Sequence, residues 1–281
     1  MHAKGAIIYG HEIFERRDTM RVLITGAGRA IGAATATELA NAGHHVIATA
    51  RDIHLLDQLD VAQRLTLDVT SDKSITGALR EAGDIDAVIN NAAINGSGPL
   101  ENFPIEQLHR IIDTNAVGPL RLLQHVLPAW RERRHGVIVN VSSVSGRVST
   151  PLDAPYSASK YALEAISEAL HYELGHFNIR TVIIEPGYIA PGMKSIERDN
   201  SNAAYHQLRE ELNGLDSKVT GPQGRTGPDV VARAIRAAIE DEHTPLRVPV
   251  GADAELILAT RSQLGDAEFE SLMRATIGLT W

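Results

Sequence analysis

Short apolar or β-branched runs alternate along the chain with longer stretches in which apolar residues recur at helical spacing. The runs predict strands at residues 22–25, 45–49, 64–67, 87–89, 137–141, 181–184 and 246–250, and the longer stretches predict helices at 30–42, 71–82, 105–133, 156–176 and 228–241. Strands that are apolar throughout and are separated by helices indicate a parallel sheet covered on both faces. We therefore predict a doubly wound α/β fold of three layers, α/β/α, that binds ligands at the carboxyl ends of its strands.

Two segments depart from this alternation. Residues 1–19 lack the continuous apolar core and cleavage site of a secretory signal, so we predict a flexible tail before a single domain at 20–281, with a docked N-terminal arm as the alternative. Residues 191–227 have a helical middle and a Gly/Pro-rich exit. A long insertion of this kind beside a rigid sheet predicts a mobile flap over the substrate pocket.

Composition and charge narrow the class of protein. A chain of 281 residues that is 43% hydrophobic can bury one sizeable core. The net charge of −8 comes without a basic block, which argues against a nucleic-acid partner. No apolar stretch approaches the roughly 20 residues that span a bilayer, and cysteine is absent. We therefore expect a cytoplasmic protein without a membrane partner, disulfides or thiolate chemistry.

A glycine-rich turn, "TGAGRAIG" at residues 25–32, joins the first predicted strand to the first predicted helix. Unpaired N–H groups and the positive end of a helix dipole can hold a pyrophosphate at such a turn. Gly26 would permit the tight turn, Ala30 the close approach of the ligand, and Gly32 the packing of helix on strand. The spacing departs from the Rossmann G-x-G-x-x-G motif, so a plain flexible turn in an α/β domain remains an alternative.

Further motifs follow in order. "NNAA" occupies residues 90–93, "NAVG" 115–118, "VNVSSVSG" 139–146, "YSASK" 156–160 and "EPG" 185–187. Together with the glycine turn, they resemble the short-chain dehydrogenase/reductase family from about residue 20 to about residue 189. Alanine replaces the middle glycine of the family's TGxxxGxG motif at Ala30 and the glycine of NNAG at Ala93. The resemblance implies a Rossmann-like oxidoreductase that moves hydride between a nicotinamide cofactor and a carbonyl or secondary alcohol.

Four residues match the family's catalytic set, namely Asn115, Ser143, Tyr156 and Lys160. Tyr156 and Lys160 are four apart in a predicted helix, so their side chains share one face. An ammonium and the oxidised nicotinamide would lower the phenol pKa from ~10, which makes Tyr156 a general acid/base. Ser143, preferred over its neighbour Ser142, would polarise the substrate oxygen, and Asn115 would by resemblance steady a water that links Lys160 to solvent. Taken alone, the tyrosine and lysine could also be an amphipathic helix with a snorkelling lysine.

Two arginines favour NADP over NAD. Arg29 lies in the glycine turn and Arg51 follows the second strand, where two guanidiniums suit a 2′-phosphate. Asp52 is the contrary signal, since it could bind the ribose if the alignment moves by two residues. Asp68 would by resemblance hold the adenine amino group, or be an N-cap-like turn residue. The predicted cofactor site comprises Gly26, Gly28, Arg29, Ala30, Ile31, Gly32, Arg51, Asp68, Val69, Asn91, Ala92, Tyr156, Lys160, Pro186, Gly187 and Ile189.

The substrate side is less specific. Pro191 stands where family members often carry a threonine for the nicotinamide carboxamide, so backbone groups at 187–189 would substitute. Candidate substrate contacts are Asn95, Val144, Ser145, Leu152, Tyr188 and Met193. The 12 histidines show no H-E-x-x-H pattern, so no catalytic metal is expected.

The family resemblance also predicts a partner: a second copy of the chain, in a homodimer or homotetramer formed through the helices at 105–133 and 156–176. Two other functions stay open. One is a nucleotide-sensing or scaffold protein with the same fold. The other is an enzyme acting on sugars or acyl thioesters, for which Lys194, Arg198 and Arg209 would supply basic groups at the pocket mouth.

Overall fold

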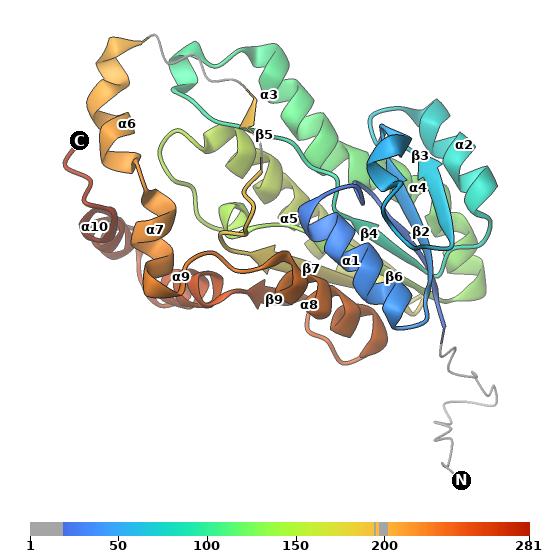
Figure 1. The fold of residues 1–281 in the computed structure, drawn as a ribbon. Helices are drawn as coiled ribbons and strands as arrows, with labels where there is room; N and C mark the ends of the chain where they lie inside the picture. Colours follow the sequence, from blue (N-terminus) through green and yellow to red (C-terminus); the bar gives the residue numbers. More distant parts are fainter. Residues whose placement is uncertain (1–18, 194, 197–201) are drawn as a thin grey trace.

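A seven-stranded parallel sheet runs through the middle of the computed structural model, which describes residues 19–193, 195–196 and 202–281 (Figure 1). Its order is β3 (Gln63–Thr66), β2 (His45–Ala50), β1 (Arg21–Ile24), β4 (Ala87–Asn90), β6 (Gly136–Val141), β7 (Ile179–Pro186) and β9 (Arg247–Val250). The strand order reverses between β1 and β4, which is where a doubly wound sheet opens its ligand crevice. The predicted fold class is therefore confirmed. The predicted tail lies, but for its last residue, outside the described residues, as do Lys194 and Arg198.

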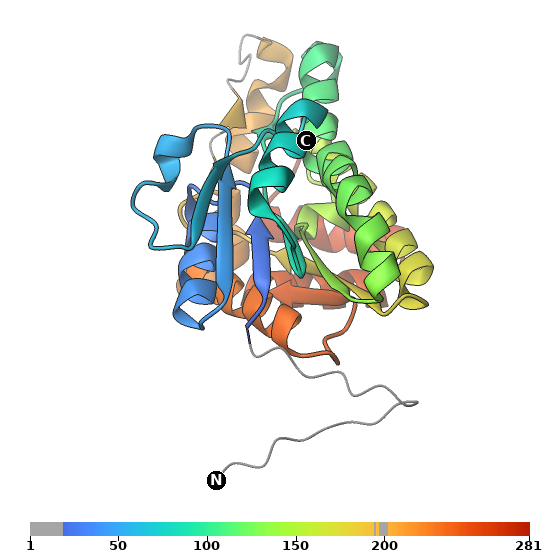
Figure 2. The same cartoon turned by 90° about the vertical axis from the view of Figure 1, so that its right-hand side faces the viewer.

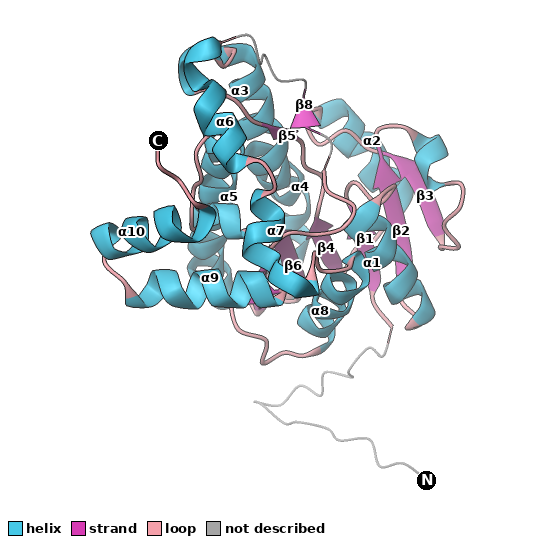
Figure 3. Cartoon of the chain, turned by 60° about the vertical axis from the view of Figure 1, so that its left-hand side comes forward, coloured by secondary structure: helices cyan, strands magenta, loops and turns pink. Residues whose placement is uncertain are grey.

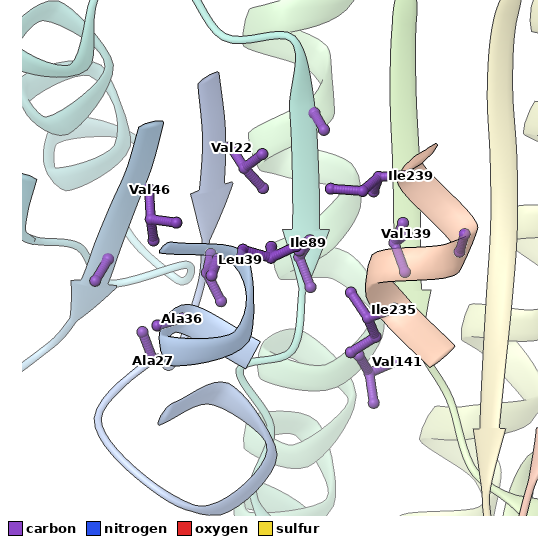
Figure 4. Close-up of a cluster of buried hydrophobic side chains, with 14 of the residues drawn as sticks. Val22, Ala27, Ala36, Leu39, Val46, Ile89, Val139, Val141, Ile235 and Ile239 are labelled. Atoms are coloured by element: carbon purple, nitrogen blue, oxygen red, sulfur yellow. The ribbon is translucent and has the colours of Figure 1, made fainter. Parts of the chain in front are cut away.

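Helices cover both faces of the sheet, and the strand side chains divide between them (Figure 2). On one face, α1 (Ala30–Asn41) and α8 (Pro228–Glu240) pack on Val22 and Ile24 of β1 (Figure 4). On the other, α2 (Asp72–Ala82), α4 (Gly118–Arg133) and α5 (Ala154–Gly175) pack on Leu23. Successive side chains of a strand point to opposite faces, so a continuous apolar run supplies both cores.

The helix predicted at 105–133 is divided in the structure. It consists of α3 (Ile105–Ile112), a π-helical turn at Asp113–Val117, and α4. Pro119 has no N–H to donate to the carbonyl of Asn115, which an uninterrupted α-helix would require. Gly118 packs tightly, since a Cβ there would lie 2.8 Å from a side-chain carbon of Val69. The π turn thus brings Asn115 to the inner side of the helix, where it is 1% exposed.

Further elements surround the carboxyl edge of the sheet (Figure 3). The helical middle predicted within residues 191–227 consists of α6 (His206–Leu212) and α7 (Leu215–Thr220). The sequence analysis did not assign α9 (Ala252–Gln263), α10 (Asp266–Ile277), or the paired short strands β5 (Asn95–Gly96) and β8 (Ser195–Ile196). Single 3-10 turns occupy Ile53–Leu56, Leu100–Asn102, Val144–Gly146, Ala203–Tyr205 and Gly221–Gln223. Asn202 donates to Glu101 at 2.8 Å and to Asn102 at 2.6 Å, which joins the flap region to the segment before α3.

Candidate active site

One cavity of about 1540 Å³ opens at the carboxyl ends of β1, β4, β6 and β7. Pockets for a single drug-sized ligand measure about 300–1,000 Å³, so this one has room for a dinucleotide and a second molecule. The structure brings nearly all the predicted cofactor, catalytic and substrate residues to its wall. The exceptions are Gly32 and Asn115, which lie behind it.

The glycine turn is packed closely on its surroundings. Gly26 has a φ of +66°, and a Cβ there would lie 2.8 Å from the Cα of Ala92. At Gly28 a Cβ would lie 2.6 Å from that of Leu55, and at Gly32 it would lie 2.3 Å from the carbonyl oxygen of Gly26. Side chains at these positions would push the turn away from its neighbours. Arg29, Ala30 and Ile31, at the start of α1, line the cavity. The first N–H groups of a helix have no helical partners, so this helix start suits a pyrophosphate.

Ala30 adopts a backbone conformation that alanine rarely adopts. Its φ is +42°, in the left-handed region, and it follows the extended residue Arg29. A Cβ in this region clashes with the backbone and costs about 1–2 kcal/mol. The effect of alanine at the middle position of the motif is therefore backbone strain, in addition to the narrower ligand approach that the sequence indicates.

Asn91 and Thr25 tie the glycine turn to the segment after β4. The Asn91 amide donates to the carbonyl oxygens of Thr25 and Gly26, both at 3.0 Å. The hydroxyl of Thr25 accepts from the backbone N–H groups of Asn91 and Ala92, also at 3.0 Å. The amide of Asn91 is thus engaged in shaping the turn, although the residue lines the cavity.

The charged residues at the far end of the cavity differ in their partners. Arg29 and Arg51 are exposed and line the cavity, and their guanidinium groups form no ion pair or hydrogen bond within the described part of the chain. Asp52 accepts from the N–H of His54 at 3.1 Å and so caps a 3-10 turn. Asp68 accepts from the N–H and hydroxyl of Thr70 at 2.9 and 2.8 Å. Asp68 is therefore a turn residue as well as a cavity residue, while the N-cap of α2 is Ser71.

Tyr156 and Ser143 lie beside each other at the centre of the cavity wall. Burial raises the pKa of the Tyr156 phenol above its ordinary value, the charge of Asp153 raises it further, and a hydrogen bond with Ser143 opposes the rise. The net effect of these groups is to raise the pKa of Tyr156, whereas the sequence analysis predicts a lowered pKa in the complex with oxidised nicotinamide. The Ser143 oxygen also accepts from the N–H of Ser145 at 3.1 Å. Ser142 is 3% exposed and its hydroxyl has no hydrogen-bond partner among the described residues.

Lys160 is buried below the tyrosine. Its Nζ atom donates to the carbonyl oxygen of Val141 at 2.7 Å and lies 5.6 Å from the centre of the Tyr156 ring. Burial lowers the pKa of Lys160 to about 8, and the charge of Glu164 opposes this. Because its pKa is this close to neutral pH, the Lys160 ammonium depends on nearby negative charge to keep its proton.

Asn115 clamps two segments behind the site. Its amide donates to the carbonyl oxygen of Ile94 and to the hydroxyl of Ser159, both at 2.9 Å, and its oxygen accepts from the N–H of Ile94 at 2.8 Å. These bonds occupy the side chain. The water-holding role implied by the family resemblance stays a prediction. The backbone carbonyl of Asn115 receives no α-helical hydrogen bond from residue 119, because Pro119 has no N–H.

The loop after β7 is held by backbone groups. The N–H of Gly187 donates to Val250 at 3.1 Å, and the N–H of Tyr188 donates to the buried carboxylate of Asp253 at 2.7 Å. A Cβ at Gly187 would lie 2.2 Å from that carboxylate. Of the backbone groups at 187–189 predicted to substitute for the missing threonine, the N–H groups of Gly187 and Tyr188 are therefore already used. The N–H of Ile189 has no hydrogen-bond partner in the described ranges.

The substrate side mixes apolar and polar groups. Burial and the charges of three aspartates raise the pKa of Tyr188 to about 12, so its phenol is protonated at neutral pH. Oδ1 of Asn95 and the hydroxyl of Ser97 are buried cavity-wall atoms without hydrogen-bond partners among the described residues. Sequence analysis missed the lining residues Ser97, Asp153, His206, Ile257 and Met273. Asp153 could have been found from its position three residues before Tyr156, and α10 from the Glu268 that caps its start.

Residues 19–193, 195–196 and 202–281 contain no group of three or more His, Cys, Asp or Glu side chains placed to hold a metal ion. No helix within these ranges combines the length and apolarity needed to cross a membrane.

Comparison with known proteins agrees with this geometry. The family model described as short chain dehydrogenase matches residues 20–202, which include the glycine turn, Ser143, Tyr156 and Lys160. Retinol dehydrogenase 8 of Homo sapiens is 38% identical over 248 residues, or 80% of this chain and 79% of the relative.

Two solved structures extend the comparison. A short-chain dehydrogenase from Streptomyces avermitilis has 32% identity and a TM-score of 0.78, over 92% of this chain and 99% of that one. A gluconate 5-dehydrogenase from Burkholderia cenocepacia J2315, solved with NADP and tartrate, has 26% identity and a TM-score of 0.69, over 86% and 97%. Among other structures of similar fold, some contain NADP and some NAD.

Proposed function

The chain belongs to the short-chain dehydrogenase/reductase family of oxidoreductases, and we propose that it interconverts a carbonyl compound and a secondary alcohol with NADP(H). The observation that carries this proposal is the meeting of Ser143, Tyr156 and Lys160 in the same cavity as the glycine turn. A nucleotide-sensing protein has no need of a buried lysine beneath a tyrosine. We therefore favour catalysis over the sensing and scaffold alternatives.

Each residue has a distinct task in the proposed reaction. The nicotinamide ring supplies or accepts the hydride when the cofactor is bound. Tyr156 gives a proton to the substrate oxygen in carbonyl reduction and takes one from the hydroxyl in alcohol oxidation. Ser143 donates a hydrogen bond to the same oxygen, where negative charge develops during reduction. The Lys160 ammonium favours the phenolate form of Tyr156 and so eases its loss of a proton.

NADP is the proposed cofactor because two arginines line the part of the cavity where its 2′-phosphate would lie. A 2′-phosphate carries negative charge and can accept paired hydrogen bonds from planar guanidiniums. Arg29 and Arg51 are exposed at the end of the cavity, and neither is neutralised by a described acidic residue. Asp52, the alternative ribose ligand, also lines the cavity but already accepts a backbone hydrogen bond. This balance of groups supports NADP over NAD.

The substrate is proposed to be a small carbonyl or hydroxyl compound that reaches Tyr156 between the segment after β4 and the flap. Asn95 and Ser97 offer polar atoms to it, whereas Leu152 and Met193 offer apolar surface. Arg209 lines the same cavity, but its two terminal nitrogens donate to the carbonyl oxygen of Asn202 at 2.9 and 3.0 Å. This gives only modest support to an anionic or acyl-thioester substrate.

The test is NADPH consumption against a panel of ketones, aldehydes, steroids, sugars and keto-esters. The native chain and Tyr156→Phe are compared with Tyr205→Phe, a control whose residue lies outside the cavity wall. We expect turnover that Tyr156→Phe lowers by about a hundredfold or more and Tyr205→Phe leaves unchanged. NADPH binding without turnover of any compound by the native chain would instead favour the sensing function.

We also propose that the chain forms a homo-oligomer through α4 and α5. Tyr161 and Tyr172 of α5 are 46% and 75% exposed, and Val117 next to α4 is 38% exposed. Large apolar side chains exposed on neighbouring helices are typical of an interface. Light scattering across micromolar concentrations should give a multiple of 30.4 kDa, and a constant monomer mass would exclude the assembly.

A further inference from the structure

Glu164 continues the line of active-site residues along α5. Tyr156, Lys160 and Glu164 are spaced by four residues, so they follow one face of the helix. Glu164 is 4% exposed, although an ionised carboxylate is costly to bury. None of the roles described above accounts for an acid at this position.

Charged groups from several elements surround Tyr156 and Glu164. They are Asp153 at the start of α5, Glu185 from β7, Arg147 from the turn after β6, and Arg247 from β9. Lys160 itself is 3% exposed, and among the described residues its ammonium donates one hydrogen bond, to the neutral carbonyl of Val141. The charge of Glu164 is the influence that opposes the effect of burial on the lysine. Glu164 is therefore the electrostatic partner of this ammonium.

The carboxylate of Glu164 is held in place but is not fully neutralised. Its Oε2 accepts from Nε of Arg247 at 3.0 Å, while Arg247 also donates to Oε2 of Glu168 at 2.6 Å. One guanidinium is thus shared between two carboxylates, which leaves the group with a net negative charge. Oε1 of Glu164 is buried and has no hydrogen-bond partner among the described residues.

That unpartnered oxygen lies near the strand end that holds the lysine. A Cβ on Gly146 would lie 3.3 Å from Oε1 of Glu164 and 2.8 Å from the hydroxyl of Ser142. Ser142 directly follows Val141, whose carbonyl oxygen accepts from Lys160. Lys160 and Glu164, on consecutive turns of one helix face, therefore both approach this end of β6.

We propose that Glu164 is the counter-charge that keeps Lys160 protonated inside the site, and that Arg247 fixes its position. The inference rests on the catalytic part proposed for Lys160, and it makes Glu164 a positioning residue that acts through the lysine. If Glu164 only tied α5 to β9, removing its charge would not change the protonation of Lys160. A direct measurement of the protonation of Lys160 separates the two roles.

The chain has five lysines, at positions 4, 73, 160, 194 and 218, so their 13Cε NMR signals can be followed individually against pH. Lys160→Arg assigns the signal of interest. Glu164→Gln removes the charge while keeping the shape, and Glu164→Asp keeps the charge. Glu173→Gln is the matched control, because it removes a carboxylate from an exposed position of the same helix that does not pair with Arg247.

We expect Glu164→Gln to lower the titration midpoint of Lys160 by roughly half a pH unit or more. Glu164→Asp and Glu173→Gln should leave it near the native midpoint. With a substrate in hand, Glu164→Gln should lose activity severalfold at pH 8 and recover it toward pH 6. An unchanged midpoint in Glu164→Gln overturns the proposal. The titration uses the full chain without turnover, so it gives its answer even if the proposed reaction is wrong.

Discussion

Asp153 and Tyr156 lie three residues apart at the start of α5 and line the same cavity, and the charge of the carboxylate raises the pKa of the phenol. Oδ2 of Asp153 accepts from the hydroxyls of Ser145 and Ser157, both at 3.3 Å, which fixes the carboxylate near the tyrosine. A raised pKa keeps the proton on Tyr156 up to higher pH. This widens the pH range over which Tyr156 holds the proton needed for carbonyl reduction.

We expect Asp153→Asn to lower the pKa of Tyr156, because the substitution removes a negative charge that disfavours the phenolate. Alcohol oxidation needs the deprotonated phenol, so its kcat/KM should rise severalfold on the acid side of the profile. Carbonyl reduction should weaken at high pH. Ser157→Ala is the control, since it removes a hydrogen bond to Asp153 but leaves the charge. Superimposable pH profiles for native and Asp153→Asn protein would refute this role.

Arg51→Ala should weaken NADPH binding by roughly tenfold and leave NADH binding nearly unchanged, because it removes a cation that faces the 2′-phosphate. Arg29→Ala should act in the same direction, and the double variant should approach equal affinities. Fluorescence titration with both nucleotides measures the ratio. Arg131→Ala, which removes an exposed arginine of α4 outside the cavity, controls for net charge. A native preference for NADH that Arg51→Ala does not alter would contradict the assignment.

The sheet and its site were predictable from local signals. The apolar runs of the central strands are long enough to be recognised because both faces of those strands are buried, as Leu23 and Val22 illustrate. The motifs around Gly26, Ser143 and Tyr156 are short and contiguous in sequence. They end up in one cavity because parallel strands bring their carboxyl ends to one edge.

What the sequence analysis missed depends on contacts between distant segments. Arg247 and Glu164 are 83 residues apart, and no local pattern joins them before β9 lies beside β7 and α5. The π turn at Asn115 follows from the missing N–H of Pro119, which helical periodicity does not register. The left-handed backbone of Ala30 is set by the packing of the turn and is invisible in the residue type.

Replacing Ala30 with glycine should stabilise the protein. The left-handed conformation costs alanine about 1–2 kcal/mol, which glycine avoids. The larger conformational entropy of glycine in the unfolded chain offsets about 0.5–1 kcal/mol of this stabilisation. We expect Ala30→Gly to raise the free energy of unfolding by about 0.5–1 kcal/mol in urea denaturation. The same substitution at Ala34, in the right-handed body of α1, should lower it by about 1 kcal/mol. Destabilisation by both substitutions would show that Ala30 is unstrained.

Glu185 should make stability fall as pH rises through neutrality. Burial and the charge of Glu164 raise its pKa to about 7 from an unfolded value near 4.5, while Arg147 and Arg247 oppose the rise. The folded state therefore binds the proton more tightly, and this stabilisation, complete below pH 4.5, is lost as pH increases through 7. Glu185→Gln stays neutral, so its gain in free energy of unfolding over the native protein should be small at pH 5 and larger by about 1–3 kcal/mol at pH 8.5. Denaturation at both pH values measures this, with Glu173→Gln, an exposed acid on α5, as control. If the native and Glu185→Gln proteins differ equally in free energy of unfolding at pH 5 and pH 8.5, Glu185 is already ionised in the folded state at the lower pH.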